Sequence, residues 1–156
     1  MFWDNQESEQ IIKQSGEKVI PVLIELLTKS EDVDTQKKVM TILGEFGEVA
    51  KSSVPTLMNY LHHAQEELCM TSALSLSKIG STSIPCLDEM IQKTEGRPKF
   101  WATWAWTLLH VDKNPDNSLR MLRNMYKQAK SEYEQIAVEE ALGKIMAQKL
   151  AVTKKE

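Results

Sequence analysis

Three tryptophans within six residues are the most concentrated chemistry in this sequence: Trp101, Trp104 and Trp106 in the stretch WATWAW. Tryptophan and arginine are the side chains that most often anchor protein interfaces. Trp101, Trp104 and Leu108 are three and four residues apart, so a helix places them on one face and Trp106 on another. Either Trp101 and Trp104 fill the space between helices, or part of the cluster binds a partner. Aromatic side chains on more than one face favour at least one exposed ring, and we expect it to be Trp101 or Trp106.

Basic residues surround and follow the tryptophans. Residues 97–130 hold seven bases and two acids, whereas residues 1–34 hold three bases and eight acids, so the net charge of −3 conceals an uneven distribution. Arg120, Arg123 and Lys127 are three and four residues apart and form a basic stripe on one side of a helix. A solvated helix face and a surface for an acidic partner segment both fit this stripe. The overall charge and a pI of 5.7 argue against nucleic acid, because a duplex-binding surface needs many phosphate contacts.

The residue types that hold metals or perform catalysis show no matching pattern. His62 and His63 are adjacent and point about 100° apart on a helix, so they cannot chelate one metal ion together. Cys69 and Cys86 lack metal-site spacing, and we expect both to be buried free thiols. The sequence contains no glycine-rich phosphate loop, nucleophile elbow or metalloprotease motif. We therefore predict a non-enzymatic protein that uses no cofactor.

Two recurring patterns predict the elements that carry these residues. In one pattern an apolar residue precedes a proline and a leucine follows two residues later, as at Pro21, Pro55 and Pro85, while Arg120 replaces the proline in a fourth copy. In the pattern that precedes it, a leucine recurs at spacings of 33, 32 and 34 residues. These periods predict a repeat of two helices. The recurring leucines are Leu43, Leu76, Leu108 and Leu142.

The proline suits the first turn of the second helix, because the backbone N–H there has no partner. Gly47 and Gly80 are expected to end the preceding helix, and Ser52, Ser53 and Ser83 are placed to cap the next one. The sequence therefore predicts an all-α fold of roughly nine helices. They are expected near residues 5–15, 17–29, 33–46, 51–63, 66–79, 82–94, 98–111, 116–130 and 132–149.

Two segments, ILGEFGEVAKSSVPTLMNYL and LSKIGSTSIPCLDEMI, resemble the short HEAT-like repeats that also occur in phycobilisome-lyase-like proteins. The resemblance covers most of residues 16–146, but Asp112 replaces the glycine and Arg120 the proline in the fourth unit. It implies an α-solenoid, an α-α superhelix of about four two-helix repeats, whose second helices line a concave side that commonly binds partners. We expect a single domain of residues 1–150 and a frayed tail of residues 151–156.

The repeat register predicts which positions of the second helices face outward, namely one, four and eight residues after the proline. This row is mixed and polar, which suits a peptide or protein surface better than a polyanion. The row supplies five residues of the predicted partner-binding set: Asn59, His63, Glu89, Lys93 and Asn124. The others form an aromatic and basic edge: Trp101, Trp104, Trp106, Arg120, Arg123 and Lys127.

These observations predict a scaffold or adaptor that binds a protein or peptide partner, including one with an acidic segment. The chain is expected to be a monomer or to self-associate weakly. Two alternatives stay open: a lyase-like or chaperone-like factor acting on a chromophore or modified protein, and a glycosylase-like nucleic-acid-binding protein. No apolar run approaches the about 20 residues of a membrane span. The start MFWDNQESEQ lacks the features of a signal peptide, so we expect a cytoplasmic location.

Overall fold

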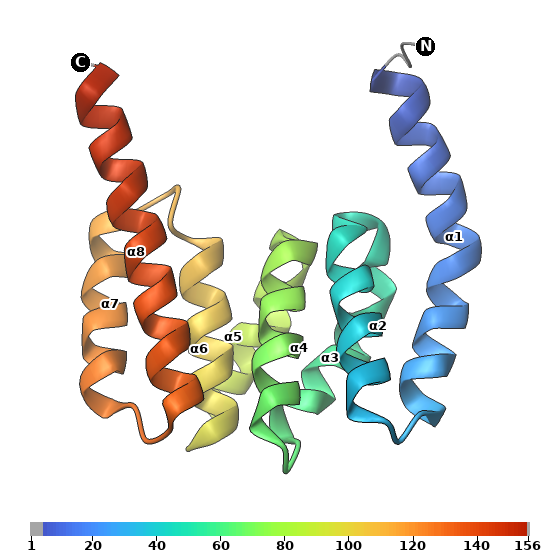
Figure 1. The fold of residues 1–156 in the computed structure, drawn as a ribbon, viewed down its shortest axis with the longest axis horizontal. Coiled ribbons are helices and arrows are strands. Elements are labelled where there is room, and N and C mark those ends of the chain that lie inside the picture. Colours follow the sequence, from blue (N-terminus) through green and yellow to red (C-terminus); the bar gives the residue numbers. More distant parts are fainter. Residues whose placement is uncertain (1–4, 156) are drawn as a thin grey trace.

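A computed structural model describes residues 5–155, which form eight α-helices and no strand. The helices lie side by side in an open array, with α1 (Asn5–Lys29) at one end and α8 (Glu132–Lys155) at the other (Figure 1). The prediction of an all-α solenoid is confirmed. Between the two ends lie α2 (Val33–Glu45), α3 (Val54–Asn59), α4 (Glu66–Ile79), α5 (Ile84–Lys93), α6 (Arg97–Leu109) and α7 (Pro115–Gln128).

The first two predicted helices form one continuous helix, α1, so the predicted break near residue 16 is wrong. A single glycine costs a helix only about 1 kcal/mol, and Ser15 is the one turn-favouring residue beside Gly16, with no proline or second glycine. Pro21 consequently lies inside α1 and not at the start of a helix. A Cβ atom at Gly16 would lie 2.3 Å from Cγ1 of Val49 in the 3-10 segment η1 (Gly47–Ser53). Gly16 therefore permits close packing of α1 and does not reverse the chain.

The connections into α3 and α5 follow the predicted plan in part. Pro55 and Pro85 lie in the first turns of these helices, as predicted. The prediction that Ser53 and Ser83 cap them is wrong, because neither side chain accepts a hydrogen bond from a helix N–H. Each hydroxyl instead donates to a carbonyl within or before a 3-10 segment, η1 or η3 (Ser81–Ser83). The accepting carbonyls are those of Ala50 and Leu76, at 2.6 and 2.9 Å.

The core lies between the stacked helices, where α2 packs on α4 and α4 on α6. The repeat leucines Leu43 and Leu76 are fully buried, while the later members of the series are half-buried. In α7, Met125 is buried in the core, whereas the neighbouring Tyr126 is 45% exposed. The hydroxyl of Tyr126 donates to the carboxylate of Glu139 at 3.1 Å, which ties α7 to α8.

The fourth unit differs from the inner ones at the start of its second helix. α7 begins at Pro115, ahead of Arg120, and the side chain of Asn114 accepts a hydrogen bond from the N–H of Asn117 at 3.1 Å. At the other end of the unit, α8 continues through Lys155. The division of the chain at residue 150 stays a prediction. None of the described helices is both long enough and apolar enough to cross a membrane.

Candidate partner-binding groove

A groove of about 660 Å³ lies between α6 and α7 and extends to the first turns of α4 and α8. We call it the α6–α7 groove. Its apolar lining comes from Phe100 on α6 and from Met121 and Met125 on α7. Methionine side chains adapt to differently shaped apolar partners, so this lining can accept more than one side-chain shape. Charged residues of both signs line the groove as well: Glu66, Glu95, Glu134, Arg97, Lys99 and Lys130.

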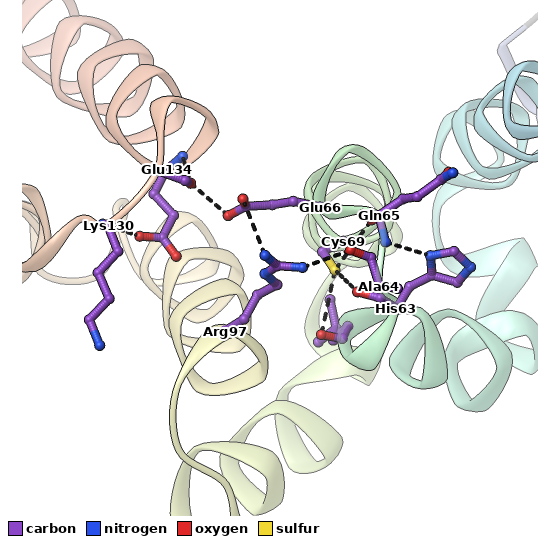
Figure 2. Close-up of polar contacts among 10 residues, drawn as sticks. His63, Ala64, Gln65, Glu66, Cys69, Arg97, Lys130 and Glu134 are labelled. Atoms are coloured by element: carbon purple, nitrogen blue, oxygen red, sulfur yellow. Dashed lines mark hydrogen bonds and ion pairs between the residues drawn. The ribbon is translucent and has the colours of Figure 1, made fainter.

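A polar network joins the first turns of three helices beside the groove (Figure 2). The guanidinium of Arg97 donates to the carbonyl of Ala64 at 3.0 Å and lies 3.8 Å from the carboxylate of Glu66. The hydroxyl of Ser131 donates to the same carboxylate at 2.7 Å. The side chain of Glu66 is only 9% exposed, so this carboxylate is largely withdrawn from solvent and satisfied within the chain. The network fixes the starts of α4, α6 and α8 relative to one another.

The start of α8 has its own reciprocal cap. The hydroxyl of Ser131 accepts a hydrogen bond from the N–H of Glu134 at 3.1 Å, and the carboxylate of Glu134 accepts one from the N–H of Lys130 at 2.6 Å. This arrangement resembles a capping box, which satisfies free N–H groups at a helix start. The ammonium of Lys130 points away from Glu134 (Figure 2) and makes no ion pair within the described residues. The carboxylate of Glu134 is therefore hydrogen-bonded within the chain, whereas the ammonium of Lys130 is not.

The cysteine beside the network is unsuited to nucleophilic chemistry. Cys69 is buried, and its sulfur lies 3.3 Å from the carbonyl of His63. Burial raises the pKa of the Cys69 thiol, and so disfavours the reactive thiolate. The expectation of two buried thiols holds for Cys69, whereas Cys86 is only half-buried. Within residues 5–155, no three histidine, cysteine or carboxylate side chains gather in a way that could hold a metal ion.

The structure corrects the predicted role of two tryptophans. Trp101 is fully buried and Trp104 is 5% exposed, so both fill the space between helices, and Trp101 is not the exposed ring that was expected at Trp101 or Trp106. Their rings meet edge to face with centroids 5.6 Å apart, and the indole N–H of Trp104 donates to the carbonyl of Ala137 in α8 at 3.1 Å. The reason is the place of α6 inside the array (Figure 1), where it packs against α4, α5 and α7 and Trp104 reaches α8. Trp106 is half-buried, stacks on His110 at 3.7 Å and does not line the groove.

The predicted basic stripe lies exposed on α7. Arg120 donates to the side-chain oxygen of Asn117 at 2.6 Å. Neither it, Arg123 nor Lys127 forms an ion pair with any described residue. Asn124, on the same helix, lines the α6–α7 groove. The structure therefore places one predicted polar residue in the groove and three unpaired cations on the helix that forms one of its walls.

The remaining predicted residues lie along the earlier second helices, outside the groove. Asn59 is exposed, and the ring of half-buried His63 accepts a hydrogen bond from the N–H of Gln65 at 3.0 Å. Glu89 and Lys93 form an exposed ion pair of 2.6 Å within α5. Whether these residues contact a partner stays a prediction.

Sequence reasoning missed most of the groove. Phe100 and Met125 were not recognised as apolar lining, and Glu66 and Ser131 meet although 65 positions separate them in the sequence. No local pattern could pair those two residues. The Ser131-to-Glu134 spacing, by contrast, is the signature of a capping box and was available from the sequence.

Comparisons with known proteins agree with this architecture. A family model described as HEAT repeats matches residues 20–107, which run from α1 into α6. The chain is also 36% identical over 145 residues to the Bacillus subtilis (strain 168) protein named "Uncharacterized protein SkfG", an alignment covering 87% of this chain and 78% of that protein. No solved structure matches the chain. The family match, which spans more than half of the chain, shows that this protein belongs to the HEAT repeat family.

Proposed function

We propose that this HEAT-repeat protein is a non-enzymatic adaptor that binds a segment of another protein in the α6–α7 groove. The observation that carries the proposal is that the acids lining the groove are bonded within the chain, whereas one of its bases is not. Glu66 and Glu134 are engaged inside the chain, and Glu95 pairs with Lys99 at 3.3 Å. Lys130 has no such partner among the described residues. The groove therefore offers a free cation beside an apolar lining.

This combination favours a partner segment with an apolar side chain flanked by acids. Burying one large apolar side chain against Phe100, Met121 and Met125 would contribute about 1.5–3 kcal/mol. The amides of Asn124 and Gln128 can donate and accept hydrogen bonds with a peptide backbone. The free cations of α7 and Lys130 would attract the acidic flank, so binding should weaken as salt is added.

The proposal keeps part of the predicted binding set and revises the rest. Arg120, Arg123, Lys127 and Asn124 belong to the proposed surface, while buried Trp101 and Trp104 support α6 from within. The row along α3 and α5 extends the surface toward the other end of the solenoid, and Trp106 lies beyond it. The extending residues are Asn59, His63, Glu89 and Lys93.

Peptide selection followed by measured affinities tests the proposal. Random peptides displayed on phage would be selected on the purified protein, and enriched sequences synthesised for fluorescence polarisation. We expect enriched peptides that place acids beside a large apolar residue. The Met121→Gln/Lys130→Glu variant should bind them at least about tenfold more weakly, because it removes apolar lining and reverses the free cation.

Lys51→Glu is the matched control, because Lys51 is exposed on η1, away from the groove, and the change alters net charge by the same amount as Lys130→Glu. Affinity in this variant should stay close to that of the wild type. Enriched peptides without acids, or equal losses in the groove and control variants, would contradict the proposal. Competition by DNA or RNA for the same surface would point to the nucleic-acid alternative.

A further inference from the structure

The last helix, α8, carries apolar side chains on two opposite faces. One face packs into the solenoid through residues such as Val138 and Ile145, which are at most 2% exposed. The opposite face presents Ile136, Met146 and Leu150 to solvent, with exposed fractions of 43, 53 and 63%. Their spacing is that of the inward positions of a coiled coil. α8 lies at the end of the helix array (Figure 1), and no described element covers this exposed stripe.

Gly143 lies within this exposed stripe, and neither its backbone angles nor any neighbour in its own chain requires a glycine there. A Cβ atom built there meets nothing within 4 Å, so alanine would fit and favour the helix by about 1 kcal/mol. The other glycines each have a reason, since added Cβ atoms at two would crowd neighbours and three have positive φ. A glycine in mid-helix lets another backbone approach closely. A second helix that crosses α8 closely at Gly143 would explain why this position has no side chain.

The charges of α8 indicate which helix that is. Residues 132–142 contain four glutamates and no base, whereas residues 143–155 contain four lysines and no acid. A second α8 running antiparallel would set each acidic half against a basic half, and a parallel one would set like charges together. With Gly143 at the crossing point, Ile136 comes opposite Leu150 of the second copy, and Glu132 opposite Lys154 of the second copy.

We propose that two copies of this chain form a two-fold symmetric dimer by antiparallel pairing of their α8 helices. The surface is self-complementary in shape and charge, as a two-fold contact requires. A helix of 24 residues is about 36 Å long, enough for roughly three heptads. Glu132 and Lys154 are exposed and form no ion pair with any described residue of their own chain. The groove-facing side of α8, with Glu134, is the buried side, so pairing leaves the α6–α7 groove open.

Sedimentation velocity of the full chain over a wide concentration range tests the dimer. The mass should rise from 17.8 kDa to twice that value and stop there. Gly143→Leu should stay at the mass of one chain. At a dilution where the wild type is also a single chain, the thermal midpoint of this variant should equal or exceed that of the wild type, because leucine favours a helix over glycine. Gln148→Leu, exposed on another face of α8, should still dimerise. A wild type that never exceeds one chain, or that grows past two, overturns the proposal.

Charge reversal tests the antiparallel register. Glu132→Lys and Lys154→Glu alone should each weaken dimerisation by about tenfold, because each places two like-charged pairs in the symmetric contact. An equimolar mixture of the two variants should dimerise more tightly than either variant alone, since both charge pairs between unlike copies then join opposite charges. A mixture no better than the single variants would refute the register. Because no peptide is needed, failure here is distinct from failure of the proposed groove function.

Discussion

Trp101 and Trp104 differ in one respect that a pair of phenylalanine substitutions can measure. Both side chains lie in the core of the solenoid on α6, and their rings touch. The indole N–H of Trp104 donates to the carbonyl of Ala137 at 3.1 Å. The indole N–H of Trp101 is buried and has no acceptor among the described residues. Phenylalanine removes the N–H and one ring of the indole at either position, so the comparison isolates the hydrogen bonding.

The expected difference follows from the two N–H groups. Trp104→Phe loses a hydrogen bond worth about 1 kcal/mol. Trp101→Phe instead removes a buried donor that costs the folded wild type about 1–3 kcal/mol. The lost ring volume destabilises both variants and largely cancels in the comparison. The free energy of unfolding of Trp104→Phe should therefore be lower than that of Trp101→Phe by about 2–4 kcal/mol.

Urea unfolding followed by circular dichroism measures this difference. With a slope near 2 kcal/mol per molar urea, the Trp104→Phe midpoint should fall about 1–2 M below the Trp101→Phe midpoint. Trp106→Phe is the control, because Trp106 is half-buried and its contact is a stacked ring, so we expect a change within about 1 kcal/mol. Equal midpoints for the two core variants, or a lower one for Trp101→Phe, would refute the reasoning from the N–H groups.

Three further outcomes follow from the fold. Gly80→Ala should lower the free energy of unfolding by about 1–3 kcal/mol in urea titration, because Gly80 has φ of +107° and the added methyl group meets no neighbour that could explain the loss. A thiol reagent should modify half-buried Cys86 in the native protein and Cys69 only on unfolding, since burial raises the pKa of Cys69. Hydrogen bonds from the Thr35 hydroxyl and N–H hold the pKa of Asp32 in the folded chain below its ordinary value of 3.8. The ionised Asp32 carboxylate therefore stabilises the fold fully above pH 3.8, and this contribution is lost as the pH falls through the folded-state pKa. Asp32→Ala should therefore unfold at a lower urea concentration than the wild type at neutral pH, and the two midpoints should converge in acid.

The repeat could be predicted from the sequence because its signals are local. Residues 66–79 were expected to be helical and are the bounds of α4. Pro55 and Pro85 lie at helix starts, as proline's missing N–H requires. Gly16 misled the prediction, because a glycine that admits a neighbour and a glycine that reverses the chain look alike in sequence. The distinguishing fact is that a Cβ atom at Gly16 would clash with Val49, a neighbour 33 positions away that no local pattern contains.

The binding surface was less predictable than the fold, because burial depends on the position of a helix in the array. Trp101 and Trp104 would suit an interface if α6 were a terminal helix. Their burial follows from neighbours on both sides, which the repeat count alone did not resolve. Asn124 is exposed and lines the groove, as its predicted outward position allows, because that position is a property of its own helix. Glu66, the centre of the polar network, gave no signal, since its partners come from α6 and α8.

The groove lies in the unit that departs most from the repeat. In the inner units, a 3-10 segment and proline start the second helix, whereas α7 starts at Pro115 and is longer, with 14 residues against 6 in α3 and 10 in α5. Near this connection α6 and α7 touch, and the hydroxyl of buried Ser118 lies 3.4 Å from the carbonyl of Thr107. The groove lies away from this connection, between the first half of α6 and the second half of α7.

Closing the groove would bring its apolar side chains, Phe100, Met121 and Met125, together and stabilise the chain. Something must therefore hold the groove open. The polar network does this, because Ser131 and Arg97 fix the starts of α8 and α6 to the buried carboxylate of Glu66. Moving α6 or α8 to close the groove would break these interactions and leave the buried carboxylate of Glu66 unpaired, which costs about 1–3 kcal/mol or more for a charged group. The groove is therefore preformed, and a partner segment would bind without the cost of ordering its site.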